Sequence, residues 1–208
     1  MEFLQEQVRL LAEFLETDYR RIVRWCGMGM AAAAALGWAA AAANPQAVDQ
    51  IVEQFMMVIE SSGVADSAGN LSPLGLLANN WQAVLFPVAM GFVPFLFLPL
   101  LTLASNGCLL GMMGLWVQQR GMSLTAYLAG ILPHGIFEIP ALVMSAACGV
   151  CLCRNMCRIV TGSRRAEPLA ELLGDLLRVM LLLVLPMIAA AAVLEAYVTP
   201  VVMSFFLR

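Results

Sequence analysis

The sequence contains no lysine, a single histidine and few charged residues of either sign. Only 12% of its 208 residues are charged, whereas 62% are hydrophobic. This charged fraction excludes an ordinary soluble domain, in which roughly a quarter of the residues are charged. Nucleic-acid binding has no support either, because there is no basic patch interleaved with aromatic residues. The composition instead predicts a polytopic helical membrane protein.

The shortage of histidine also limits catalytic chemistry. A catalytic zinc ion usually takes three protein ligands and a water molecule, whereas the sequence has no HExxH motif and no second histidine beside His134. Serine-nucleophile motifs are not recognisable in it. An intramembrane metallohydrolase is therefore the least favoured function, and we expect no enzymatic activity, no metal and no cofactor.

Cysteine is present but does not predict a metal site. Four of the six cysteines fall in one helical stretch, at Cys148, Cys151, Cys153 and Cys157. At about 100° per residue their side chains do not share one helix face. We interpret them as small apolar residues in a reducing environment.

The most informative stretch is the apolar run 124–153, which is longer than the ~20 residues that a helix needs to cross ~30 Å of hydrocarbon. His134 and Glu138 are four residues apart in it and therefore lie on one helix face. No arginine falls inside an apolar run, so Glu138 is either paired with His134 or protonated. Ionisable groups at this depth normally face a protein interior or a wet cavity. The predicted intramembrane polar core comprises His134, Glu138, Gly135 and Pro140.

The first part of the chain predicts an amphipathic helix followed by a membrane span. Residues 1–21 form the amphipathic helix, on the cytoplasmic side, and the span continues to about residue 43. Residues 45–72 form an extracytoplasmic excursion with a second amphipathic helix. This helix acts either as a lid over the spans, which we favour, or as a docking face for a partner.

The apolar stretch 74–117 is too long for one span and barely enough for two. A break at Asn106 and Gly107 would leave a second piece too short to cross a bilayer. Either the turn falls earlier, near Pro99, or the pair is a re-entrant hairpin. Gly107 and Gly111 also form a GxxxG motif, which favours close helix packing. The predicted helix break comprises Asn106, Gly107 and Gly111.

The last span is expected from about residue 169 or 172 to 198, bent at Pro186. Arginines cluster before the first span and in residues 154–165, whereas 44–78 has none. The positive-inside tendency then places the N-terminus in the cytoplasm and 44–78 outside. Counting residues from the span ends gives a second, outer polar cluster: Asn79, Asn80, Glu195, Tyr197 and Thr199.

The predicted fold is therefore all-α, a polytopic membrane bundle of about five spans with kinked or broken helices and amphipathic surface helices. Residues 22–200 form its single transmembrane domain, and 201–208 form a C-terminal tail. The predicted location is the plasma or inner membrane, crossed several times.

Several separated motifs resemble the stage II sporulation protein M family. They are LANNWQAVLF at 77–86, Gly91, Asn106-Gly107 with Gly111, LPHGIFEIPA at 132–141 and LEAYVTP at 194–200. The resemblance covers about residues 74–200 and implies an integral membrane protein with about five spans. In spore-forming bacteria the namesake belongs to a membrane complex with peptidoglycan-degrading partners that drives engulfment of the forespore.

Two functions follow from these features. The first is a non-enzymatic scaffold or assembly subunit of a cell-envelope complex, with membrane lipid and other membrane or envelope proteins as partners. In that case His134 and Glu138 form a structural clasp between bent helices. The alternative is a permease-like transporter subunit for a small or lipidic substrate, acting alone or as a homodimer. A cavity that reaches Glu138 would favour this alternative.

Overall fold

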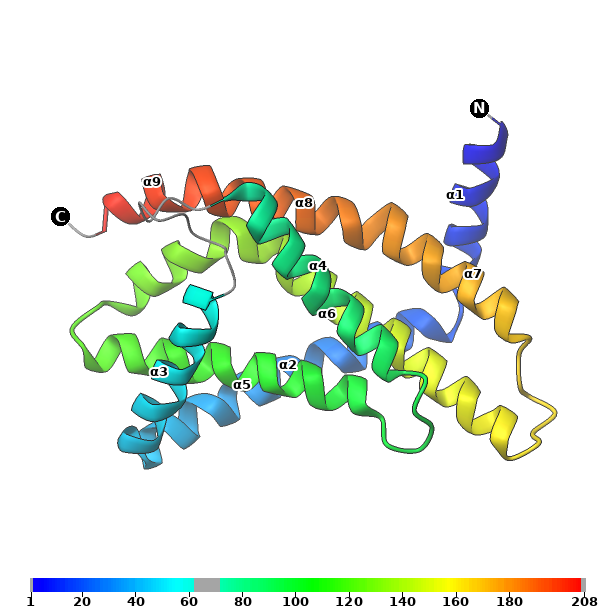
Figure 1. Ribbon diagram of the computed structural model, residues 1–208, viewed down its shortest axis with the longest axis horizontal. Helices are drawn as coiled ribbons and strands as arrows, with labels where there is room; N and C mark the ends of the chain where they lie inside the picture. The colour runs from blue at the N-terminus through cyan, green and yellow to red at the C-terminus, as the bar shows by residue number, and fades with distance from the viewer. Residues whose placement is uncertain (1, 62–71, 207–208) are drawn as a thin grey trace.

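The computed structural model describes residues 2–61 and 72–206 (Figure 1). The chain is 87% helical, and the described residues include no strand. This confirms the all-α prediction for a membrane bundle. The helices before the C-terminal rod are α1 (Glu2–Leu15), α2 (Asp18–Ala43), α3 (Pro45–Ser61), α4 (Pro73–Met90), α5 (Leu98–Gln119) and α6 (Leu124–Val160).

The C-terminal rod is the nearly continuous helix Leu169–Ser204. It consists of α7 (Leu169–Val179), α8 (Leu185–Val193) and α9 (Thr199–Ser204), joined by the π-helical turns η1 (Met180–Val184) and η2 (Leu194–Val198). Pro186 and Pro200 lie in the first turn after each π segment. Proline removes a backbone donor and crowds the preceding turn, so the wider π turns absorb the two prolines without ending the helix.

Within the described residues, four helices are long and apolar enough to cross a membrane: α2, α5, α6 and the C-terminal rod, with 26, 22, 37 and 36 residues. The 18-residue α4 runs beside them but falls outside this set, since it carries the amides Asn79, Asn80 and Gln82. The structure therefore supports a bundle close to the predicted size.

Helix α6 lies at the centre of the bundle and packs against α2, α4, α5 and the C-terminal rod. Its most buried part, 141–153, consists mainly of small residues. Pro133 and Pro140 both lie inside the helix, which is visibly bent in Figure 1, as expected for internal prolines. The helix continues past the predicted end at Cys153 to Val160. Arg154 and Arg158 are therefore helical, and ion pairs with Asp18 and Glu167 hold their side chains.

The predicted helix break at Asn106 and Gly107 is wrong, because α5 runs through both residues without interruption. The chain turns earlier, between Met90 and Leu98, which is the alternative that placed the turn near Pro99. Gly107 and Gly111 serve helix packing instead. A Cβ on Gly107 would meet the Met30 carbonyl oxygen at 2.6 Å, and one on Gly111 would overlap the carbonyl of Ala34. The GxxxG motif thus brings α5 against the backbone of α2.

The N-terminal boundaries also differ from the prediction. Helix α1 ends at Leu15, and α2 begins at Asp18 rather than at residue 22. Thr17 causes the break, since its hydroxyl accepts the backbone N–H of Tyr19 and so caps α2. Tyr19 is then buried and donates a hydrogen bond of 2.9 Å to the Met144 carbonyl of α6.

Helix α3 follows the end of α2 and lies across α5 (Figure 1). Its buried Val48 and Val52 pack against Met112, Met113 and Trp116 of α5. Asp49 accepts hydrogen bonds from Arg120 at 2.7 Å and Trp116 at 3.0 Å. These contacts favour the interpretation of α3 as a lid. The remainder of the predicted 45–72 excursion, residues 62–71, lies outside the described residues, as do residues 207 and 208 of the predicted tail.

Candidate functional site

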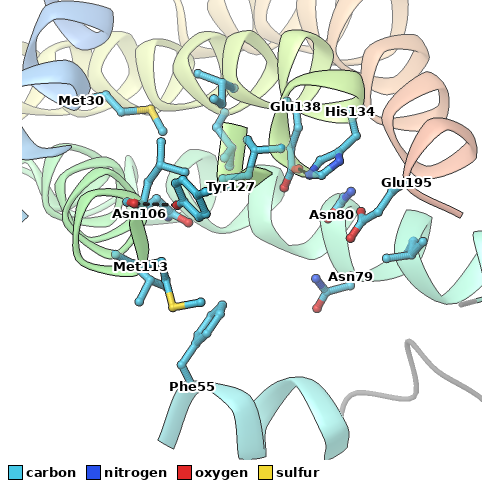
Figure 2. Close-up of a pocket in the computed structure, with 17 residues that line it drawn as sticks. Met30, Phe55, Asn79, Asn80, Asn106, Met113, Tyr127, His134, Glu138 and Glu195 are labelled. Atoms are coloured by element: carbon cyan, nitrogen blue, oxygen red, sulfur yellow. Dashed lines mark hydrogen bonds and ion pairs between the residues drawn. The ribbon is translucent and has the colours of Figure 1, made fainter. Parts of the chain in front are cut away.

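A cavity of about 430 Å³ opens between α3, α4, α5, α6 and η2. Its walls are mostly apolar, with Met30, Phe55 and Met113 among them (Figure 2). The volume lies in the range of about 300–1,000 Å³ that is usual for small-molecule sites. The polar lining residues are Asn79, Asn80, Asn106, Tyr127, His134, Glu138 and Glu195.

The polar end of the cavity is built around His134, Glu138 and Glu195, with one ligand atom of each residue within 4.8 Å of the others. His134 Nε2 lies 3.9 Å from Glu138 Oε2, as the four-residue spacing predicts. Figure 2 shows these two side chains next to each other on α6, facing Glu195. Their side chains are only 14% and 27% exposed, so the acid and the imidazole face the protein interior.

The other nitrogen of the His134 ring contacts the C-terminal rod. Nδ1 lies 3.2 Å from the hydroxyl of Thr199, which itself donates to the Leu194 carbonyl at 3.3 Å. With the Thr199 hydroxyl donating to Leu194, its oxygen can accept a hydrogen bond from the imidazole, which corresponds to the tautomer with the proton on Nδ1. In that tautomer the Nε2 lone pair of His134 faces the carboxylates.

The sequence predicts two separate polar clusters, and the structure joins them into one. The sequence predicts Glu195 and Thr199 near the outer boundary, because it predicts that the last span ends at Val198. The rod instead continues to Ser204. Glu195 is then nine residues from the rod's end and His134 ten from the start of α6, or ~14 and ~15 Å at 1.5 Å per residue. The two side chains therefore meet at equal depth.

The remaining predicted residues divide between the cavity and its surroundings. Tyr197 is 65% exposed and does not line the cavity. Pro140 is exposed and also lies outside the lining, whereas Gly135 is buried within it. Asn106 lines the cavity while its amide donates to the Thr102 carbonyl at 2.9 Å. Of the predicted polar-core and outer-cluster residues, Tyr197 and Pro140 are therefore the two that the structure places on the surface and away from this cavity.

Asn79 and Asn80 occupy different positions because consecutive helical residues are about 100° apart. Asn79 is exposed at the cavity wall, whereas Asn80 is only 5% exposed. The side-chain nitrogen of Asn80 is buried and has no hydrogen-bond partner. Buried amides are normally paired, so an orphaned one in a cavity wall marks a place where a ligand oxygen or water fits.

Sequence reasoning missed the meeting of Glu195 with His134 and Glu138. The sequence offers only two candidate metal ligands close together, and the structure supplies a third from a helix more than fifty residues further along the chain. The one available signal was the length of the apolar rod beyond Glu195. In the part of the chain that the structure describes, the cysteines of α6 form no comparable group.

Together, an apolar cavity and a compact polar cluster between α6 and the C-terminal rod give this apolar helical bundle, of the membrane-protein class, a candidate binding site. The chain belongs to the stage II sporulation protein M family, whose sequence model matches residues 27–200. An uncharacterized protein of Methanocaldococcus jannaschii is 29% identical over 132 residues, which cover 64% of this chain and 73% of the relative. No solved structure matches the chain. Neither the name of the family nor that of the relative mentions an enzymatic activity.

Proposed function

We propose that the protein is a permease-like membrane subunit that holds a small or lipidic molecule in the cavity between α3 and α6. The observation that carries this proposal is the cavity itself, which reaches Glu138. A clasp between helices requires only that the polar groups contact each other, whereas here they line an open volume of about 430 Å³.

The lining suits an amphipathic molecule. Phe55, Met113 and Leu110 supply apolar wall, and the polar end offers acceptors on Glu138 and Glu195 and a free donor on Asn80. Binding sites of this kind combine an apolar enclosure with a few polar groups that fix orientation. Phe55 of α3 lines the cavity on the side away from the polar cluster (Figure 2), so movement of α3 would change access to the bound molecule.

The test is a variant that fills the cavity without touching its polar end. Met113→Trp adds bulk at the wall, and Met28→Trp adds the same bulk at a position that is 53% exposed. The expected result is that Met113→Trp alone loses co-purifying lipid in native mass spectrometry and loses translocation of a fluorescent phospholipid in proteoliposomes. Equal lipid binding and translocation in the parent and both variants would contradict the proposal.

A second function, a scaffold or assembly subunit of a cell-envelope complex, is favoured by α1. Phe3, Leu4 and Val8 are 77%, 60% and 52% exposed on this amphipathic helix. A hydrogen bond of 2.8 Å from Arg178 to Gln7 anchors α1 to the rod. Cross-linking in the native membrane tests this role: Leu4→Asp should abolish adducts with other envelope proteins and leave lipid binding intact. Unchanged adducts would count against it.

A further inference from the structure

The donor atoms of His134, Glu138 and Glu195 form a set that fits one metal ion. A tetrahedral ion with ligand distances of about 2.0–2.2 Å needs donors roughly 3.3–3.6 Å apart. The observed 3.9 Å between His134 and Glu138, and the 4.8 Å limit for all three, are within reach of small side-chain rotations. No arginine lies among the described lining residues, so His134 is the one basic side chain there beside two carboxyl groups.

The orientation of the imidazole supports the same conclusion. In the tautomer with Nδ1–H donating to Thr199, the Nε2 lone pair of His134 faces the carboxyl groups of Glu138 and Glu195. A metal ion between three such acceptors satisfies all of them at once. Metal-binding histidines usually have their second nitrogen fixed by such an outer hydrogen bond, and Thr199 supplies it here.

Asn80 provides an independent observation. Its side chain is 95% buried, with a nitrogen that has no partner, and it points toward the three donors in Figure 2. A donor in this position fits a water or ligand oxygen held in the fourth coordination place. Three protein ligands and one exchangeable place facing a cavity are the arrangement of an open zinc site.

We propose that His134, Glu138 and Glu195 bind a divalent cation of the Zn²⁺ class at the polar end of the cavity, with Asn80 directed at its fourth ligand. The inference deepens the proposed function and rests on the same cavity. One imidazole and two carboxylates suit Zn²⁺, Mn²⁺ or Fe²⁺ better than Mg²⁺ or Ca²⁺, and the absence of a sulfur donor among them disfavours Cu⁺. A doubly charged ion also neutralises both carboxylates inside the bilayer.

The experiment measures zinc binding by the full chain in lipid nanodiscs, purified without a polyhistidine tag. Metal analysis after removal of free Zn²⁺ should give one equivalent per chain. Glu138→Gln and Glu195→Gln keep the side-chain shape and should each lower zinc affinity by more than about 100-fold, whereas Thr199→Val, which removes only the outer hydrogen bond, should lower it by about 10–100-fold. The matched control is Glu171→Gln, an exposed carboxylate on the same rod, which should change nothing.

A Co²⁺-loaded sample separates this site from the cysteines of α6. Bound Co²⁺ should show ligand-field absorption without a thiolate charge-transfer band. Folded protein that takes up no zinc would overturn the inference, as would zinc that persists in the Glu138→Gln and Glu195→Gln variants and disappears in Cys153→Ser.

The inference and the proposed function fail in different ways. If Met113→Trp has no effect on lipid while one zinc remains bound through Glu195, the permease-like function fails and the metal site stands. If lipid binding depends on the cavity but no zinc binds, only the metal site is refuted.

Discussion

At the scale of single residues, the packing of the bundle depends on glycines, which have no side chain. Gly37, Gly107 and Gly111 let α2 and α5 approach until backbone meets backbone. In a bilayer, close van der Waals packing replaces much of the hydrophobic driving force that acts in water. Each of these glycines therefore contributes to stability through the contact that its absent side chain permits.

Gly111→Ala should destabilise the protein by about 1–3 kcal/mol, because its Cβ would overlap the Ala34 carbonyl and force α2 away from α5. The matched control is Gly29→Ala on α2, where nothing lies within 4 Å of the new methyl group. It should be neutral or stabilising by up to about 1 kcal/mol, since alanine favours helix. Thermal unfolding in detergent measures both, and equal melting temperatures would contradict the packing argument.

Glu138 gives a second prediction at this scale, measured in protein stripped of metal. In the metal-free protein a protonated Glu138 carboxyl offers one donor and one acceptor, as the glutamine amide does, so Glu138→Gln should fold as the parent does. Glu138→Ala should lose more than about 1 kcal/mol, since it leaves the polar neighbours of the cluster without a partner. Fluorescence-detected size-exclusion chromatography after heating compares the three proteins. Equal losses from both variants would indicate an ionised pair with His134 instead.

At the scale of helices, the attachment of α3 to α5 combines apolar and polar contacts. Arg120 stacks over the Trp116 ring at 3.8 Å while it donates to Asp49. The hydrogen bond from Arg120 is the main cause that lowers the pKa of Asp49 below its usual value. The pair is about half exposed, so it directs the position of α3 more than it stabilises the fold.

The lowered pKa sets the pH dependence of this attachment. Asp49 contributes fully to the attachment of α3 to α5 above its unfolded pKa of about 3.9. This contribution is lost as the pH falls through the still lower pKa of Asp49 in the folded protein. A nitroxide at the exposed Gln54 should therefore stay immobile at neutral pH and gain mobility only in strong acid. In the Asp49→Asn variant the same label should be mobile both at neutral pH and in strong acid. A label in that variant as immobile as in the parent would show that Val48 and Val52 hold α3 alone.

Some helices could be predicted from the sequence more closely than others. Helix ends are predictable where a local signal exists. A serine directly before a proline, as at Ser72 and Pro73, favours the start of a helix, and the Ser72 hydroxyl accepts the Gly75 N–H to cap α4. The course of α5 was not predictable, because Ser105, Asn106 and Gly107 form a turn signal that tertiary packing on α2 overrides. The pairing of His134 with Glu138 followed from helix geometry. Its extension to Glu195 depends on how two distant helices align, which no local pattern encodes.

At the scale of the whole molecule, the two ends of the bundle differ in charge. Arg20, Arg21 and Arg24 lie at the start of α2, at the same end as the loop between α6 and α7 with Arg164 and Arg165 (Figure 1). Helix α3 lies at the opposite end with Asp49 and Glu53. By the positive-inside tendency, this distribution of charge again predicts that the N-terminus is cytoplasmic.

This prediction can be checked by labelling in intact cells with a membrane-impermeant maleimide. Glu53→Cys on α3 should react from outside, whereas Glu16→Cys, between α1 and α2, should react only after permeabilisation. Both positions are exposed, and the parent protein measures the background of its own cysteines. The reverse pattern would invert the orientation.

The residues around the polar cavity come from opposite stages of synthesis. Asn80 and the pair on α6 are made well before Glu195 and Thr199, which lie in the C-terminal rod. Until this rod inserts, an acid and an imidazole lie in the bilayer without their partners, at a cost that insertion scales put at about 2.5–3.5 kcal/mol for an isolated charge. The nascent chain is therefore most exposed to membrane-insertion factors and quality-control proteases in the interval between insertion of α6 and insertion of the rod.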